Sequence, residues 1–140
     1  MTDSALVAKK LALIETYLRE LRELGRPDQI ERDVRERRFV EHTLQLAIQA
    51  ALDVASHIAS DNRLGEPRTH HELFTLLERF GWIAPDVSVN LRKMAGFRNI
   101  LVHGYDKVCP DVVRDVVLSH LGDLDAFVAA VRAALAKKTP

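Results

Sequence analysis

Residues 40–60, "VEHTLQLAIQAALDVASHIAS", carry the clearest helical signal in the chain. Their apolar side chains recur at alternating intervals of four and three, which is the period of one face of an α-helix. The residues on this face are Val40, Leu44, Ala47, Ala51, Val54 and Ile58. Because alanine recurs among them, a neighbouring helix can pack closely here. We therefore expect a long helix from Asp28 to Ser60, whose charged first half, residues 28–42, lies in solvent.

The other periodic segments also predict helices. Residues 7–24 repeat the same spacing, after a cap at Asp3 or Ser4 and before a stop at Gly25. Further helices are expected at residues 70–80 after a Thr69 cap, from Asp86 or Ser88 to residue 101, and from residue 112 to residue 137. No segment alternates with the period of a β-strand. The sequence therefore predicts an all-α protein, an up-and-down bundle of four to five helices in one domain, residues 1–140.

Composition limits the classes of function. The 140 residues carry a formal net charge of zero, so the chain lacks the overall basic field of a strong nucleic-acid binder. The single cysteine, Cys109, excludes an internal disulfide and suits a reducing cytoplasm. No apolar run approaches the roughly 20 residues of a membrane span, and the N-terminal sequence does not read as a signal peptide. We expect a cytoplasmic protein with no membrane partner.

A second stretch, "GFRNILVHGYDKV" at residues 96–108, places a guanidinium, an imidazole and a phenol where an apolar helix ends. One interpretation is purely structural. Arg98 and Asn99 would be solvated, His103 would complement the helix dipole, and Gly104 would end the helix in a left-handed conformation.

A functional interpretation follows from the spacing of the same residues. Asn99 and His103 are four apart and share a helix face, so the amide can orient the imidazole. Arg98 lies about 140° around the helix from His103, so the two converge only where the helix ends or tightens near His103. A guanidinium binds phosphate in bidentate fashion, and an imidazole shuttles protons at neutral pH. The set suits phosphodiester chemistry without a metal.

The motif Arg98-x4-His103-x-Tyr105 resembles the R-x4-H-x-Y signature of HEPN-domain ribonucleases, and the chain is similar to the HepT-type toxins among them. The resemblance covers nearly the whole chain, because further segments follow in the family's order. These are "YLRELREL" at 17–24, "TLQLAIQAALDVASHIAS" at 43–60, "HHELFTLLERFGWI" at 70–83 and "LRKMAGFRNILVHGY" at 91–105.

The resemblance implies an activity and partners. It implies a cofactor-free and metal-independent endoribonuclease that acts on RNA as a homodimer, with two motifs facing each other. It also implies an MntA-like nucleotidyltransferase antitoxin, which can join a larger complex and transfers AMP to the motif tyrosine. Carried over, Arg98 and His103 are catalytic, Asn99 supports them, and Tyr105 is the modified residue. His42 stands where the family often has arginine, so the RNA-binding surface of the second helix does not follow from the resemblance.

Asp53 and His57 are four apart on the second predicted helix, so a hydrogen bond between carboxylate and imidazole is feasible. They are either a satisfied polar pair in a packed helix or a pair that supports the site. The histidines His70, His71 and His120 give no ligand geometry. We find no metal-binding cluster and no glycine-rich phosphate loop.

A second class of function remains open on the sequence. The chain can instead be a non-catalytic helical dimer that serves as a docking module for a nucleotidyltransferase. The arginines of residues 32–38 alternate with acidic residues that cancel their field, so this run indicates either a solvated face or a docking surface rather than an RNA-binding one.

Overall fold

The computed structural model of the chain describes residues 3–104 and 107–138. Within these ranges the regular structure is helical and contains no strand, which confirms the predicted all-α class. In chain order the elements are α1 Ser4–Leu24, η1 Pro27–Gln29, α2 Val34–Asp61, α3 His70–Arg79, α4 Pro85–His103, α5 Pro110–Asp115, η3 Val116–His120 and α6 Leu121–Lys138.

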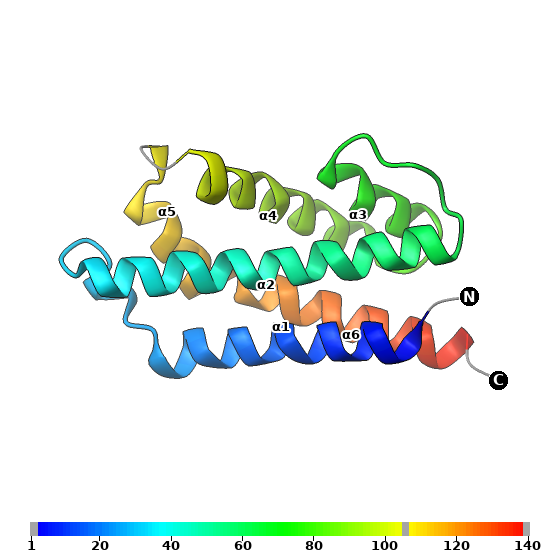
Figure 1. Cartoon of the computed structure of the whole chain (residues 1–140), viewed down its shortest axis with the longest axis horizontal. Helices are drawn as coiled ribbons and strands as arrows, with labels where there is room; N and C mark the ends of the chain where they lie inside the picture. The colour runs from blue at the N-terminus through cyan, green and yellow to red at the C-terminus, as the bar shows by residue number, and fades with distance from the viewer. Residues whose placement is uncertain (1–2, 105–106, 139–140) are drawn as a thin grey trace.

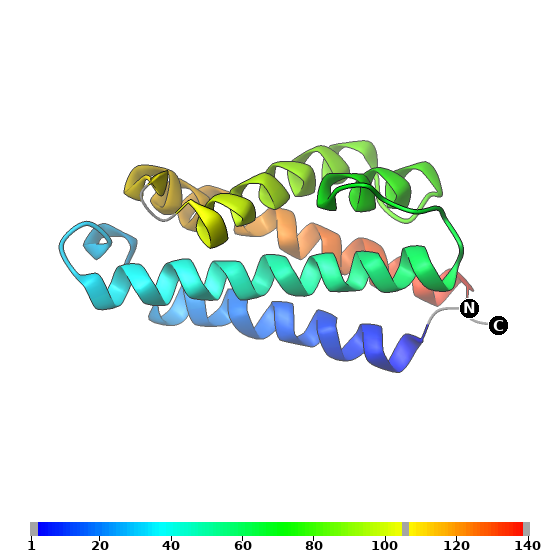
Figure 2. The same cartoon turned by 45° about the horizontal axis from the view of Figure 1, so that its top comes forward.

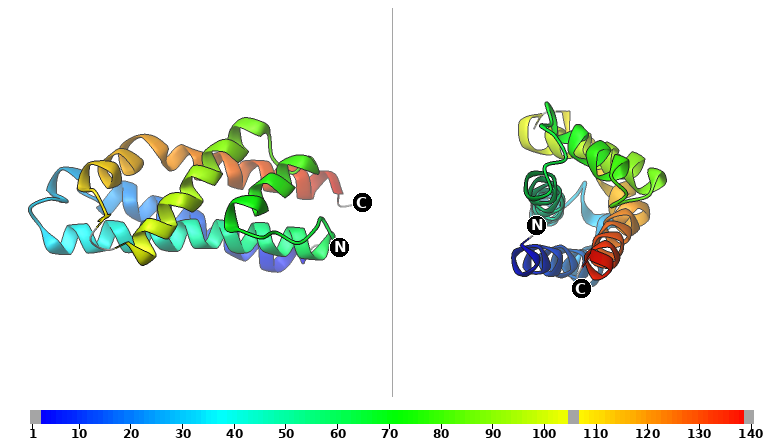
Figure 3. Two further views of the ribbon diagram at one scale, coloured as in Figure 1. Left: turned by 90° about the horizontal axis from the view of Figure 1, so that it is seen from above. Right: turned by 90° about the vertical axis from the view of Figure 1, so that its right-hand side faces the viewer.

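Four long elements, α1, α2, α4 and α6, run up and down beside one another (Figure 1). Contacts link α1 to α2, α2 to α4, α4 to α6 and α6 back to α1, so the four enclose one core. Figure 2 shows α1 and α2 side by side with α6 behind them, and the end-on view in Figure 3 shows the ring. Seen from above in Figure 3, α4 crosses the other helices obliquely, and α3 lies beside its first part.

The apolar face that decides the fold is fully buried. The six residues of the α2 stripe each have 0% of their surface exposed, and so do Val7, Leu11 and Ile14 of α1. In α1, Asp3 caps the first turn by accepting from the Leu6 amide, as expected. None of the helices in the described ranges has the length and apolar composition that crossing a bilayer requires.

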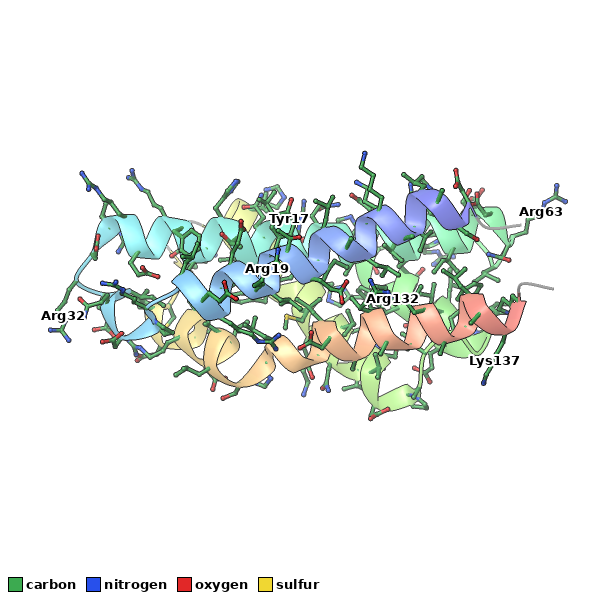
Figure 4. The ribbon with its side chains drawn as sticks, turned by 90° about the horizontal axis from the view of Figure 1, so that it is seen from below. Tyr17, Arg19, Arg32, Arg63, Arg132 and Lys137 are labelled. Carbon is green, nitrogen blue, oxygen red and sulfur yellow. The ribbon has the colours of Figure 1, made fainter. Side chains whose placement is uncertain are left out.

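Ion pairs tie α1 to α6 on the outside of the bundle, along the face shown in Figure 4. Arg132 donates to both carboxylate oxygens of Glu15, at 2.9 and 2.5 Å, and Arg22 donates to Asp125 at 2.5 Å. The hydrogen bond from Arg132 holds the pKa of Glu15 below its ordinary value. These pairs are half-exposed, so they fix the relative position of the helices more than they stabilise the fold.

The second helix begins later than the sequence predicts. Residues from Asp28 onward form the short helix η1 and a turn, and α2 starts at Val34 because the Asp33 carboxylate caps it. Arg114 of α5 holds this turn by donating to Glu31 at 2.8 Å. The charged run is also not wholly solvated, since burial raises the pKa of Glu41 against the opposing effect of Arg37.

The cap of α3 is as expected, whereas the start of α4 is not. Thr69 caps α3 by accepting from the Glu72 amide, as predicted, and Glu72 in turn accepts from the Arg68 amide at 2.7 Å. The expected start of α4, at Asp86 or Ser88, was wrong. The helix starts at Pro85, whose ring suits a first helical position, and Ser88 is buried one turn in, with its hydroxyl donating to the Phe74 carbonyl.

The last helix starts at residue 110 rather than 112 and is interrupted. It begins as α5, widens into the π-helical segment η3 at Val116–His120, and continues as α6 to Lys138. A π-helical turn inserts one extra residue per turn, which shifts the side chains that follow around the helix axis. Phe127 of α6 thereby lies edge-on to Phe74 of α3, with the ring centroids 5.8 Å apart.

We predict that Phe127→Ala lowers the free energy of unfolding by about 3–5 kcal/mol, because its ring is fully buried and leaves a cavity. Urea denaturation followed by circular dichroism measures this change. Leu118→Ala is the matched control, since that side chain is 67% exposed and its loss should cost little. Equal midpoints for the two variants would contradict the packing described here.

Candidate active site

The motif occupies the last two turns of α4, where one face of the helix is left uncovered. Gly96, Asn99 and His103 follow one another at intervals of three and four, so they share this face. Asn99 is half-buried and His103 is exposed. Arg98 lies on a different face, in a row with the buried residues Leu91 and Ala95.

The covering helix α3 reaches α4 only as far as Gly96. Farther along α3, Glu78 lies 4.0 Å from Arg92 of α4. At its first turn the His71 Nε2 atom lies 3.5 Å from the position that a Cβ on Gly96 would take. Because α3 begins at His70, it does not extend over the turn that carries Asn99 and His103. The uncovered end of α4 is therefore set by where α3 starts.

Arg98 places its charged group between the buried row and the uncovered face. Its Nη1 atom donates to the Asn99 Oδ1 atom at 3.3 Å, and Asn99 belongs to the uncovered face. Its Nε atom is buried, and no described residue accepts a hydrogen bond from it. A buried donor without a partner costs free energy, so the guanidinium is held where its donors are not all satisfied.

Asn99 therefore has a different partner from the one the sequence suggested. Its side-chain carbonyl accepts from Arg98, and no hydrogen bond joins it to His103 within the described ranges. The helix runs to His103, two residues beyond the expected residue 101, and it does not tighten there, since Gly104 closes an ordinary α-helical turn by donating to the Ile100 carbonyl at 2.9 Å. Among the described residues, the hydrogen-bond partner of the Arg98 guanidinium is Asn99 rather than His103.

The expected left-handed conformation of Gly104 is wrong. Its φ is −119°, a value open to other residues. Space at this position is nevertheless limited, because a Cβ there would lie 3.2 Å from the Ile100 carbonyl oxygen. Glycine allows the chain to leave α4 close to its last turn, directly after His103.

Asp53 and His57 do not form the pair that their spacing suggested. The Asp53 carboxylate instead accepts from Lys10 of α1 at 3.3 Å and from Gln49 at 2.9 Å. Asp53 thus joins α2 to α1, and no hydrogen bond to its carboxylate from half-buried His57 occurs in the part of the chain that the structure describes. The partners of Asp53 depend on how α1 packs against α2, so helical spacing alone could not predict them.

Two other histidines make contacts that the sequence did not predict. His71 lies against Gly96 beside the motif, although its neighbour His70 is exposed. His120 lies between Asp115 at 3.1 Å and Asp123 at 3.5 Å. The sequence offered one signal for the contact between His71 and Gly96, namely that α4 contains a glycine and α3 begins with a histidine pair.

Tyr105 lies outside the described residues. Among the residues that are described, no group of three or more His, Cys, Asp and Glu side chains is arranged to hold a metal ion. The polar groups placed at the uncovered end of α4 are therefore a guanidinium, an amide and two imidazoles.

Comparison with known proteins assigns the family. The family model described as "Ribonuclease HepT-like" matches residues 14–131. An mRNA nuclease HepT of Shewanella oneidensis is 33% identical over 129 residues, covering 91% of this chain and 97% of the relative. A tRNA nuclease HepT of Aphanizomenon flos-aquae is 30% identical over 113 residues, covering 79% and 77%.

A solved structure has the same fold. A tri-AMPylated HEPN toxin of Shewanella oneidensis, in complex with an MNT antitoxin, superposes with a TM-score of 0.86 at 34% identity, covering 95% of this chain and 99% of that one. The match of the family model spans the core helices and the whole Arg98–His103 segment. The chain belongs to the HepT-like ribonuclease family.

Proposed function

We propose that this chain is a metal-independent endoribonuclease toxin in which Arg98 and His103 carry out the reaction. The observation that carries the proposal is a half-buried guanidinium that lacks a described acceptor for its Nε atom and is bonded to Asn99, in the same last turns of α4 that carry exposed His103. Membership of a ribonuclease family supports it, as do the two relatives whose names describe them as RNA nucleases.

The two groups supply different parts of phosphodiester cleavage. The 2′ oxygen of RNA attacks the adjacent phosphorus, the bond from phosphorus to the 5′ oxygen breaks, and the products are a 2′,3′-cyclic phosphate and a 5′-hydroxyl. His103 takes the proton from the 2′-hydroxyl or gives one to the leaving 5′ oxygen. Arg98 stabilises the negative charge that builds on the phosphoryl oxygens. Because the attack needs the 2′-hydroxyl, DNA is not cleaved.

Two protomers complete the chemistry. One imidazole cannot act at both oxygens in the same instant, whereas two copies of His103 facing each other provide a base and an acid. A two-fold dimer brings the same surface of each chain together, so the uncovered end of α4 would meet its own counterpart. Asn99 keeps each guanidinium on the side of the cleft. Asp53 and His57 have no assigned part in this reaction.

We predict that His103→Ala abolishes cleavage of single-stranded RNA, measured by gel electrophoresis in the presence of a chelator. The expected loss is roughly 100-fold or more, because proton transfer by a positioned side chain contributes about that much. His120→Ala is the matched control, since its exposed imidazole lies on η3 and is held by Asp115 and Asp123. Cleavage that needs added Mg²⁺, or that survives in His103→Ala, would contradict the role of His103 and favour a non-catalytic docking module.

A second variant, Arg98→Lys, tests whether the reaction needs the guanidinium group rather than only a positive charge. An ammonium keeps the charge but loses the two parallel donors that bind a phosphate. We expect a fall in kcat of roughly 100- to 1000-fold, with the helical content unchanged by circular dichroism. Full activity in this variant would show that only the charge matters at residue 98.

We further propose that an MntA-like nucleotidyltransferase is the antitoxin and that it transfers AMP to Tyr105. A relative at 34% identity is described as tri-AMPylated and bound to an MNT antitoxin. Tyr105 follows Gly104 directly, and α4 ends at His103, so the tyrosine is two residues from the catalytic imidazole in sequence. A phosphate attached there adds negative charge that pairs with Arg98 and occupies the place of the RNA phosphate.

Intact-mass spectrometry tests this step. Incubation with ATP, Mg²⁺ and the nucleotidyltransferase should add one or more AMP units to the native protein and stop RNA cleavage. Tyr105→Phe should receive none, because it lacks the phenolic oxygen that attacks the α-phosphorus of ATP and displaces pyrophosphate. Tyr17→Phe is the matched control and should be modified as the native chain is. An equal increment on Tyr105→Phe would remove Tyr105 from this role.

We predict that the chain forms a dimer at micromolar concentration, as measured by light scattering. The chain has a mass of 15.8 kDa, so the expected species is twice that mass. The reason is chemical, since the reaction proposed above uses two copies of His103. A purely monomeric protein that still cleaves RNA would contradict the shared site.

A further inference from the structure

We propose that His71, which lies outside the motif, binds a nucleotide that flanks the scissile phosphate. The proposal rests on the ribonuclease function argued above and adds a substrate-binding residue to it. The observation behind it is the place of the His71 imidazole, whose Nε2 atom lies 3.5 Å from the Cβ position of Gly96, at the edge of the uncovered end of α4.

Gly96 is the residue of α4 that lies directly beside the imidazole. It belongs to the same face of α4 as Asn99 and His103, and it has no side chain to fill the space beneath His71. At Gly96 the His71 ring therefore lies against the α4 backbone rather than against a side chain, on the face of α4 that carries the motif.

The distance from His71 to the reaction centre fits a strand of RNA. Seven residues separate Gly96 from His103, which corresponds to roughly 10 Å along the helix at about 1.5 Å per residue. A stacked strand advances about 3.4 Å per nucleotide, so this distance equals roughly three nucleotides. An RNA strand laid along this face with its scissile phosphate at His103 therefore reaches His71 with a neighbouring nucleotide.

The chemistry of His71 suits that contact. An imidazole offers a flat ring on which an unpaired base can stack and a ring nitrogen that can hydrogen-bond to a base edge or phosphate. Its side chain makes no hydrogen bond to any residue in the described ranges, although its backbone carbonyl accepts from Thr75. The ring is half-buried, so one part is held by α3 and α4 while another meets solvent.

The neighbouring histidine provides a matched control. His70 precedes His71 on the first turn of α3, and consecutive helical residues point about 100° apart. His70 is exposed, and it is not the residue that contacts Gly96. Both residues are histidines in the first turn of α3, but only His71 lies beside the motif.

Kinetics on two substrates test the proposal. The ratio of kcat/KM for a ten-nucleotide RNA to that for a dinucleotide should fall roughly five- to tenfold in His71→Ala, mainly through a higher KM for the longer RNA. The ratio in His70→Ala should match the native protein. A general loss of structure would lower both substrates together, so an unchanged ratio in His71→Ala would overturn the proposal.

A binding measurement separates this proposal from the proposed function. Fluorescence anisotropy of a labelled all-2′-deoxy decamer measures affinity without any cleavage. The dissociation constant should rise roughly fivefold or more in His71→Ala and should not change in His70→Ala. If the native chain fails to cleave RNA, the proposed function fails, and a weaker decamer affinity in His71→Ala still supports this contact. Equal affinities for native and His71→Ala proteins, or no binding by the native chain, would refute it.

Discussion

The site depends on how α4 is buried. One row of its residues, Leu91, Ala95 and Leu101 among them, packs into the bundle, and Arg98 occupies a position in that same region of the helix. The fold therefore holds a cation next to an apolar surface, with its Nε atom buried and without a described acceptor. A group in that position does not stabilise the fold. In the proposed function a bound phosphate supplies the missing acceptor, and donors that are already held in place need little rearrangement when charge develops on it.

The rest of the molecule keeps that end of α4 in place. The alanine-rich stripe of α2 lets its neighbours approach closely, and α2 contacts both α1 and α4. The capping pair of Thr69 and Glu72 defines where α3 starts, and so defines how much of α4 stays uncovered. A helix α3 that began one turn earlier would reach over Asn99. The start of this ten-residue helix thus decides how much of the motif-bearing face of α4 is covered by α3.

Sequence reasoning succeeded where the information is local. The apolar period of α1 and α2 predicted the buried residues, and the Asp3 and Thr69 caps follow from one residue and the turn after it. It failed where a distant group decides the outcome. Arg114, far along the chain, holds the turn before α2 and delays its start, and Lys10 takes the carboxylate that spacing assigned to His57. The position of His71 was missed for the same reason, because only the packing of α3 on α4 brings it to Gly96.

A chain with zero net charge can act on a polyanion only through a few well-placed groups. Salt dependence reflects the number of phosphates that are neutralised, so the proposed site, in which Arg98 is the main cation, should lose little affinity as salt rises. In the proposed reaction, selectivity for RNA rests on position and on the 2′-hydroxyl rather than on attraction at a distance. The proposed inhibition follows from the same arrangement: a phosphate attached to Tyr105 would compete with the substrate for Arg98 directly, with no need to alter the fold.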